Sequence, residues 1–313
     1  MDVTGNKKSN INMETLTISY SFFTPKSLNK EMRFWDNYNF PDRYWYNIPS
    51  SMCVNNILYP NSKIKIHISP SIKNHFLFEM LEKIPQYFSN IEVVEMDYDY
   101  QNTEPTMWRY KPLLNKESDV VLCRDIDSLP NSDEFLATTY FLNNPNFFVH
   151  TLRTHTNHVI PQTIILAGLC GFRPKNIKYL QGVDFDSYYN HFKNAVWGLD
   201  QSSLINMFVR EKDWVKNHFL DSPISTQLHR VGPPLIDCNS LNQDYYHQNV
   251  NVNLDKTLFD ILDTETKWAG EPTNFRGQKF VDFLNLDYDT VRTMKDLLSS
   301  CSTEVQNFYF QSV

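Results

Sequence analysis

The chain has 313 residues, enough for one large α/β domain or two small ones, and its 41% hydrophobic content indicates a globular protein rather than a disordered one. The net charge of −7 and the lack of a basic run argue against nucleic acid as a partner. The five cysteines are dispersed and show no CxxC spacing, which argues against a disulfide framework and a structural zinc site.

Several features bear on where the protein acts. Residues 1–13 are polar and predict a flexible tail instead of a signal peptide. No window approaches the roughly 18 apolar residues of a membrane span. The polar N-terminal residues, the lack of a membrane span and the odd number of cysteines together favour a cytoplasmic protein. The chain is rich in asparagine, lysine, isoleucine and tyrosine and has only eight glycines, which is typical of an AT-rich genome. We interpret it as viral, acting in the host cytoplasm.

Strands and helices alternate along the first hundred residues. Strands are expected over 16–23, 63–68 and 91–96, and helices over 50–58 and 71–87. The aromatic-rich segment 33–48 is expected to pack in the core. This alternation predicts an α/β fold with a mixed, mostly parallel sheet flanked by helices.

The rest of the chain continues the pattern and then changes character. A short helix is expected over 105–114, a buried strand over 120–123, a helix over 133–143, a strand over 147–152 and a helix over 200–209. Beyond Asp221 the composition predicts loops, with a closing helix over 282–298. We therefore expect a tail over 1–13, a core over 14–225, and a loop-rich C-terminal extension over 226–313 that packs on the core.

Two aspartates follow the buried strand directly. Asp125 and Asp127 stand where the chain leaves the sheet, flanked by Arg124 and Ser128. In an open α/β sheet, ligands bind outside the carboxyl ends of the strands. Two carboxylates that converge at such a turn suit Mg²⁺ or Mn²⁺, which could neutralise a diphosphate.

Five motifs in the same order resemble those of GT-A-fold, nucleotide-sugar-dependent glycosyltransferases. Residues 107–113 and 119–128 (MWRYKPL and DVVLCRDIDS) resemble the "W-R-F-x-P … hhh-S-R-D-x-D-S" core of that group. Four further matches follow, at 150–158 ("h-x-h-R-D-H-x-x-H"), 164–171 ("h-x-G-G-h-W-G"), 198–204 ("Y-G-x-D-Q-x-h-L") and 221–222 ("H-D-S"). The chain departs from the group's pattern at Thr154, Ala167 and Cys170.

The resemblance implies a hexosyltransferase-type enzyme. It would move a sugar from a nucleotide diphosphate donor, UDP-linked, to a hydroxyl of a glycan or protein. Asp127, with Asp125, would hold Mn²⁺ or Mg²⁺ against the diphosphate, and His218 or His229 would complete the metal site. The expected cationic contacts to the donor are Arg109, Lys111 and Arg124.

Other residues are expected around the donor. Tyr20, Ser21 and Phe22 would meet the base and ribose, and His155 and His158 would bond sugar or phosphate oxygens. Gly168 and Gly171 would let the backbone approach a ligand or a strand closely.

Asp200 and Gln201 begin a helix that should face the transferred sugar. Asp200 would act as the base in an inverting mechanism or position the sugar in a retaining one, and it also suits a helix cap.

Two other functions remain open. A haloacid-dehalogenase-type phosphatase would use Asp125 as its nucleophile, but its D-x-D-x-T/V pattern requires Thr or Val where this chain has Leu129. A non-catalytic carbohydrate-binding protein would explain the aromatic residues but not the paired carboxylates. A dehydrogenase is disfavoured because no G-x-G-x-x-G follows a strand. The second D-x-D, Asp184 to Asp186, follows no apolar strand and is interpreted as a loop or helix cap.

Overall fold

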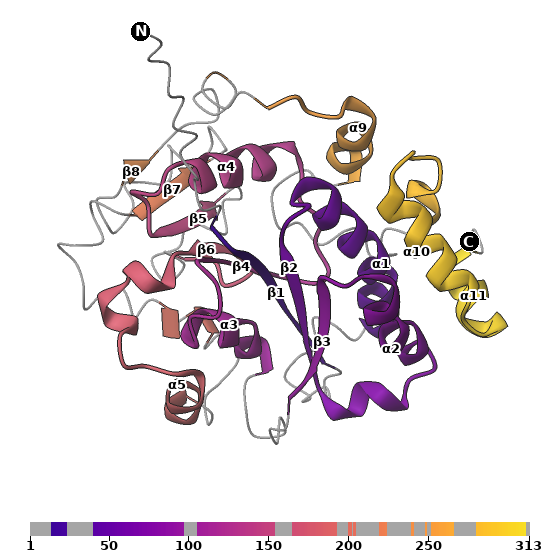
Figure 1. The fold of residues 1–313 in the computed structure, drawn as a ribbon, viewed down its shortest axis with the longest axis horizontal. Helices are drawn as coiled ribbons and strands as arrows, with labels where there is room; N and C mark the ends of the chain where they lie inside the picture. The colour runs from indigo at the N-terminus through magenta and orange to yellow at the C-terminus, as the bar shows by residue number, and fades with distance from the viewer. Residues whose placement is uncertain are drawn as a thin grey trace, which may run out of the picture.

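The computed structural model describes residues 14–23, 40–96, 105–153, 165–192, 200–201, 203–204, 219–223, 239–240, 248, 252–265 and 280–310. Its centre is an eight-stranded sheet in the order β3-β2-β1-β4-β6-β5-β7-β8 (Figure 1). The strands are β1 (Leu16–Phe22), β2 (Lys63–Ile68), β3 (Ile91–Glu95), β4 (Val120–Arg124), β5 (Val149–Arg153), β6 (Leu169–Phe172), β7 (Phe219–Pro223) and β8 (Asn239–Ser240).

The order of the strands creates a switch point beside β1. The chain first builds outward from β1 to β2 and β3, and then returns to place β4 on the other side of β1. Both neighbours run parallel to β1, so the carboxyl ends of β1 and β4 lie together. In open α/β sheets, the crevice outside such a switch point is where ligands bind.

Parallel pairing dominates, with one reversed strand. β6 runs antiparallel to β4 and β5, whereas β5, β7 and β8 run parallel to one another. The predicted fold class, a mixed, mostly parallel sheet flanked by helices, is confirmed.

Helices cover both faces of the sheet. One face packs against α1 (Phe40–Leu58), α2 (Phe78–Tyr87) and the start of α4 (Ser132–Asn143). The other face packs against the 3₁₀ helix η2 (Pro105–Tyr110), α3 (Lys111–Leu114) and α5 (Phe185–Phe192). The period-two alternation of β1 explains its fit. Ile18, Tyr20 and Phe22 enter the α1 core, whereas Thr17, Ser19 and Ser21 alternate with them, and Ser21 contacts η2.

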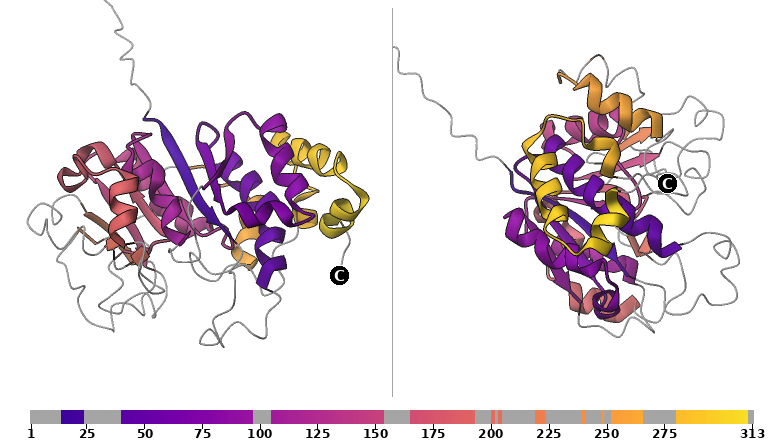
Figure 2. Two further views of the ribbon diagram at one scale, coloured as in Figure 1. Left: turned by 90° about the horizontal axis from the view of Figure 1, so that it is seen from below. Right: turned by 90° about the vertical axis from the view of Figure 1, so that its right-hand side faces the viewer.

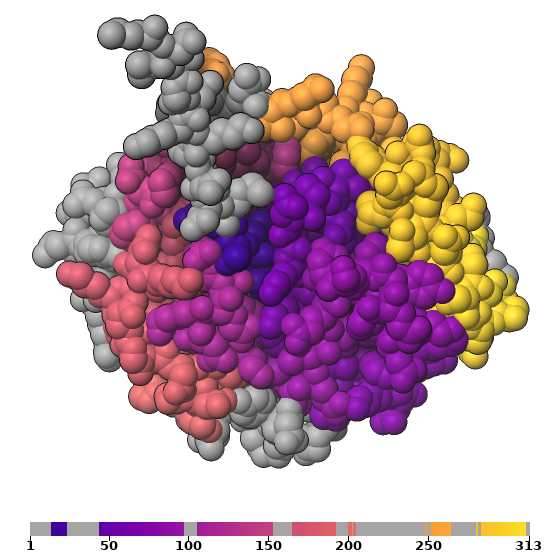
Figure 3. Space-filling view, in the orientation of Figure 1, coloured from indigo at the N-terminus to yellow at the C-terminus, as the bar shows by residue number. Residues whose placement is uncertain are grey.

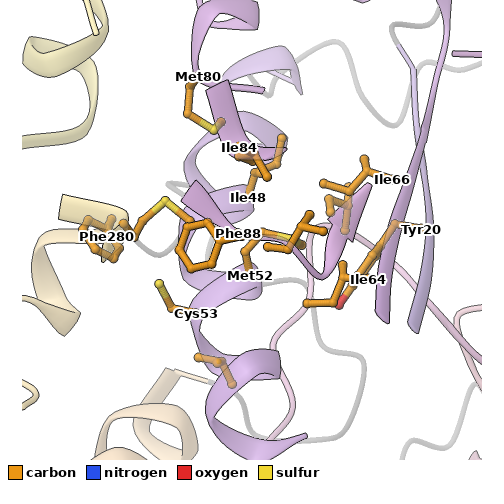
Figure 4. Packing of buried hydrophobic residues seen from close by; sticks show 14 of the residues in the cluster. Tyr20, Ile48, Met52, Cys53, Ile64, Ile66, Met80, Ile84, Phe88 and Phe280 are labelled. Carbon is orange, nitrogen blue, oxygen red and sulfur yellow. The ribbon is translucent and has the colours of Figure 1, made fainter. Parts of the chain in front are cut away.

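The C-terminal segment adds helices to the α1 side. α9 (Lys256–Glu265), the 3₁₀ helix η7 (Phe280–Phe283), α10 (Asp289–Ser299) and α11 (Thr303–Phe310) all contribute residues to the core that contains α1. α10 and α11 lie on the outer side of α1 and α2 in Figures 1 and 2, and their surface continues that of the N-terminal half in Figure 3. In Figure 4, Met52 of α1 lies between Ile64 of β2 and Phe280.

Several helix boundaries differ from those expected. α1 starts at Phe40 and continues through Pro49, so it is longer than the predicted 50–58. The helix expected over 71–87 is instead a 3₁₀ turn, η1 (Pro70–Asn74), followed by α2. The helix expected over 282–298 is likewise divided, because a turn in which Leu286 N donates to the Phe283 carbonyl (2.9 Å) separates η7 from α10. No described helix has both the length and the apolar character needed to cross a membrane.

Candidate functional site

The turn that carries the two aspartates is fixed from several directions. β4 ends at Arg124, and Asp125 and Asp127 flank Ile126, whose side chain is buried in the α1 core. Asn47 of α1 donates from Nδ2 to the carbonyls of Ile126 (2.6 Å) and Ser128 (3.4 Å). Ser128 bonds the Asp125 carbonyl through its amide (3.4 Å) and its hydroxyl (3.2 Å). The turn is therefore held in one shape before any ligand binds.

The Asp125 carboxylate lies over Gly168 and remains 44% exposed. A Cβ on Gly168 would stand 1.9 Å from Asp125 Oδ2, so only glycine leaves room for this carboxylate. Gly171 has a different role, because a Cβ there would meet Leu122 (2.8 Å) and Phe141 (3.0 Å) in the core. The close approach predicted for both glycines is to protein atoms in each case.

Arg109 connects Asp125 to Asp200. Its buried guanidinium forms an ion pair through Nη1 with Asp125 Oδ1, and its Nη2 is 3.4 Å from Asp200 Oδ2. Burial opposes the charge on Arg109, but the two carboxylates outweigh that effect and raise its pKa. The positive charge is thus permanent.

Asp200 is buried at the start of a short helical segment. Its Oδ1 accepts from the Gln201 amide (2.9 Å), and its carbonyl accepts from the Tyr110 hydroxyl (3.3 Å) and the Ser203 hydroxyl (2.9 Å). Burial raises the pKa of the Asp200 carboxyl, and the Arg109 charge offsets part of that rise. This carboxylate is held in place and partly shielded from water. Those properties suit a group that accepts a proton, or a hydrogen bond from a sugar hydroxyl.

Of the three residues predicted to meet the base and ribose, Ser21 lies beside Arg109. Its hydroxyl accepts from the Arg109 amide (2.9 Å) and donates to the Thr106 carbonyl (3.1 Å). Tyr20 and Phe22 point to the opposite face and are 1% and 3% exposed. Tyr20 bonds Asn55 (2.7 Å), and Phe22 packs edge-on against Trp45.

The two other predicted cations have different surroundings. Arg124 forms a buried ion pair with Glu134 (2.9 Å) and donates to the Thr138 hydroxyl (3.2 Å), so its guanidinium is engaged by α4. Lys111 is half-buried at the first position of α3, directly after η2. The second D-x-D behaves as predicted, because Asp184 accepts from the Ser187 amide (2.7 Å) and caps α5.

A divalent cation such as Mg²⁺ prefers oxygen ligands, and the aspartate turn supplies two carboxylates. Within the described parts of the chain, no three His, Cys, Asp or Glu side chains form a metal-binding group. Mg²⁺ needs only one or two protein carboxylates when waters and phosphate oxygens supply the rest, so Asp125 and Asp127 fit a metal–diphosphate pair. His218 and His229, the two candidates for the third metal ligand, lie outside the described residues, as do His155 and His158, which are expected to bond sugar or phosphate oxygens.

Sequence reasoning missed two residues that shape the site. Asn47 fixes the aspartate turn, and Thr106 accepts from both Arg109 Nε (2.8 Å) and Ser21 through its carbonyl. A signal for Asn47 was present, since asparagine is a poor residue for a helix interior among apolar neighbours. Thr106 acts through its backbone carbonyl, which every residue has, so its residue type gives no signal of this role.

The sequence matches no family model and no curated protein. Solved structures with an overall likeness include S. aureus TarS in complex with UDP, which is 12% identical with a TM-score of 0.43 over 91% of this chain and 70% of that one. TarS in complex with UDP-GlcNAc is 10% identical, with a TM-score of 0.39 over 95% of this chain and 72% of that one. The mannosyltransferase PcManGT from Pyrobaculum calidifontis, in complex with GDP-Man and Mn²⁺, is 11% identical, with a TM-score of 0.38 over 94% and 77%. The sheet order and the strand directions of this chain define its fold.

Proposed function

We propose that this protein is a metal-dependent glycosyltransferase. It moves a sugar from a nucleotide diphosphate donor, UDP-linked, to a hydroxyl of a glycan or protein. The observation that carries the proposal is that Arg109 forms ion pairs with both Asp125 and Asp200. These three residues lie at the carboxyl end of β4, beside the switch point of the sheet.

The chemistry of sugar transfer gives each carboxylate a role. Cleavage of a sugar–diphosphate bond requires stabilisation of the negative charge that develops on the departing nucleotide. A divalent cation supplies that stabilisation when bound, and Asp125 and Asp127 are the residues that would hold it. Asp200, buried and fixed by Gln201 and Arg109, would accept the proton of the acceptor hydroxyl or position the transferred sugar.

The first experiment is calorimetric binding of UDP, GDP and CDP, with and without Mn²⁺, to the wild-type protein and to Asp127→Ala. We expect UDP to bind in a metal-dependent way and the variant to lose that binding. Asn56→Ala is a suitable control, because Asn56 of α1 donates to the Met52 carbonyl and accepts from Asn90, which precedes β3, and neither contact involves the aspartate turn. Donor hydrolysis with a panel of UDP-sugars would then identify the sugar.

Measurements of nucleotide binding and of phosphatase activity can also contradict the proposal. If no nucleotide binds under either condition, while a generic phosphatase substrate turns over and Asp125→Asn abolishes that turnover, the protein is a phosphatase instead. Binding of glycans without any nucleotide binding or turnover would favour the carbohydrate-binding alternative.

A further inference from the structure

We propose that Arg109 is a positioning residue that links Asp125 to Asp200, and that it is not a ligand of the donor diphosphate. This inference rests on the proposed function and deepens it. The sequence predicts that Arg109 contacts the diphosphate, as one of three cationic residues. The contacts of its side chain point to a different role.

The first argument is the number of donors that Arg109 has already used. A guanidinium has five N–H donors. Four of them have partners within the protein, namely the Thr106 carbonyl, the Arg124 carbonyl, the Asp125 carboxylate and the Asp200 carboxylate. At most one donor remains for a ligand, whereas recognition of a phosphate by arginine characteristically uses two parallel bonds.

The second argument is how the Arg109 backbone is held. Its amide donates to the Ser21 hydroxyl of β1, and Cys123 of β4 contacts its carbonyl (3.7 Å). The backbone is thus fixed to both strands that flank the switch point, and the side chain is 5% exposed. A side chain held in this way cannot move toward a mobile ligand. It can, however, fix the Asp125 and Asp200 carboxylates relative to the sheet.

The third argument is the charge balance. One permanent cation stands between two carboxylates that come from different parts of the chain, the end of β4 and the start of a helix. Without the cation the two carboxylates would repel each other in a partly desolvated space. Because the two terminal nitrogens belong to one rigid plane, binding both carboxylates also fixes their separation. Lysine, a point charge, would supply the charge without the geometry.

This arrangement predicts what Arg109 does for the reaction. Asp125 is on the donor side of the proposed site, and Asp200 faces the transferred sugar or the acceptor. By linking them, Arg109 sets the distance between the bound diphosphate and the group that acts on the sugar. The effect of Arg109 on turnover should therefore depend on Asp200.

A double-mutant cycle tests this dependence. Arg109→Lys, Asp200→Asn and the double variant are compared with the wild type for donor hydrolysis and UDP affinity. We expect Arg109→Lys to lower kcat roughly 100-fold, as misplacement by about 1 Å can do. Its Kd for UDP should stay within about threefold of wild type, because Asn47 and Ser128 still hold the turn that carries Asp125 and Asp127. In the Asp200→Asn background the lysine should lower kcat less than about threefold further.

The opposite pattern overturns the inference. If Arg109 binds the diphosphate directly, Arg109→Lys raises the Kd for UDP at least about tenfold, and its effect multiplies with that of Asp200→Asn because the two residues act independently. Arg173→Lys is the matched control for altering a buried arginine. Arg173 pairs with Glu14 and with carbonyls around the end of α4, so it should affect stability but neither kcat nor the Kd for UDP.

Urea unfolding of the same four proteins separates this inference from the proposed function. If the wild type binds no nucleotide, the proposed function fails, but the link between Arg109 and Asp200 can still be tested. Shifts of the unfolding midpoint that are clearly less than additive for Arg109→Lys and Asp200→Asn support that link. Additive shifts reject it whatever the protein catalyses.

Discussion

Gly168 and Gly171 lie three residues apart, yet their missing side chains leave room for different neighbours. Gly168 makes room for the Asp125 carboxylate, whereas Gly171 makes room for Leu122 and Phe141. Gly168→Ala should therefore displace Asp125 and weaken metal-dependent UDP binding about tenfold or more, with a small effect on stability. Calorimetry measures the first quantity and urea unfolding the second.

Gly171→Ala provides the comparison. Its Cβ overpacks the core, which typically lowers the free energy of unfolding by about 1–3 kcal/mol. At a temperature where the variant is folded, its UDP affinity should match that of the wild type. Equal losses of UDP binding in both alanine variants would show that Gly168 has no special relation to Asp125.

Asn47 holds the aspartate turn by two hydrogen bonds to backbone carbonyls. Asn47→Ala leaves the carbonyl of Ile126 without this buried donor, and should lower the free energy of unfolding by about 1–3 kcal/mol. The freed turn should also lower UDP affinity, because Asp125 and Asp127 are no longer held in one arrangement. Asn56→Ala, on the same helix, should leave UDP affinity unchanged, and an unchanged affinity in Asn47→Ala would contradict the role given to Asn47.

At the residue scale, the sequence predicts the position of the aspartate turn better than it predicts side-chain contacts. The position of Asp125 and Asp127 follows from a buried strand and its exit, which are local features. By contrast, the sequence-based prediction places Tyr20 and Phe22 at the base and ribose together with Ser21, although alternation along β1 sends them to the opposite face. The pairing of Arg124 with Glu134 depends on where α4 packs, and nothing in the residues around Arg124 specifies it.

Among the elements, α4 depends on a side chain from outside the helix. Arg173, which follows β6, donates to the carbonyls of Phe141 (3.2 Å), Leu142 (3.0 Å) and Phe147 (2.7 Å) and pairs with Glu14. Its charge also complements the negative end of the helix dipole. Arg173→Met should lower the free energy of unfolding by about 2–3 kcal/mol, because buried carbonyls lose their donors.

The measurement is urea unfolding, with UDP affinity as the second readout. Because none of the residues that Arg173 contacts belongs to the aspartate turn, we expect the folded variant to bind UDP as the wild type does. Lys175→Met is a control for loss of an exposed cation. It should change the free energy of unfolding by less than about 1 kcal/mol, because its pairing with Asp119 lies at the surface. A loss as small as that in Arg173→Met would refute the capping role.

Strands were easier to predict than helix boundaries for a physical reason. β2 spans the predicted residues, since alternation of apolar residues with lysine and histidine is a strong local signal. The helices expected over 71–87 and 282–298 both contain a turn that apolar spacing does not reveal. The reversed direction of β6 depends on its neighbours in the sheet, and so could not be deduced from its own residues.

For the molecule as a whole, the C-terminal helices and α1 share one hydrophobic core. Met294→Ala and Phe280→Ala should each lower the free energy of unfolding by about 2–5 kcal/mol, because both side chains are fully buried. Unfolding should remain a single transition by fluorescence and circular dichroism. Tyr87→Ala, at an exposed position, should shift stability by less than about 0.5 kcal/mol. A separate early transition in Phe280→Ala would show that the C-terminal segment folds independently.

Stability of the whole molecule should also fall in mild acid. Burial lowers the pKa of His67 from 6.5 to about 4, and its Nδ1 lies 3.0 Å from the Tyr20 carbonyl. Between these values the unfolded chain binds a proton that the native protein does not, so stability rises with pH there. Burial also lowers the pKa of His150, so its effect has the same sign.

The pH prediction can be tested on one substitution. The stabilisation linked to neutral His67 is fully present above about pH 6.5 and is lost as the pH falls through about 4. A pKa lowered from 6.5 to about 4 corresponds to about 3 kcal/mol in the free energy of unfolding. We expect His67→Gln to be less stable than the wild type at pH 7 but to lose less stability between pH 7 and pH 4, measured by urea unfolding at several pH values. Parallel curves for the two proteins would mean that His67 is not buried as a neutral ring and that other groups determine the acid sensitivity.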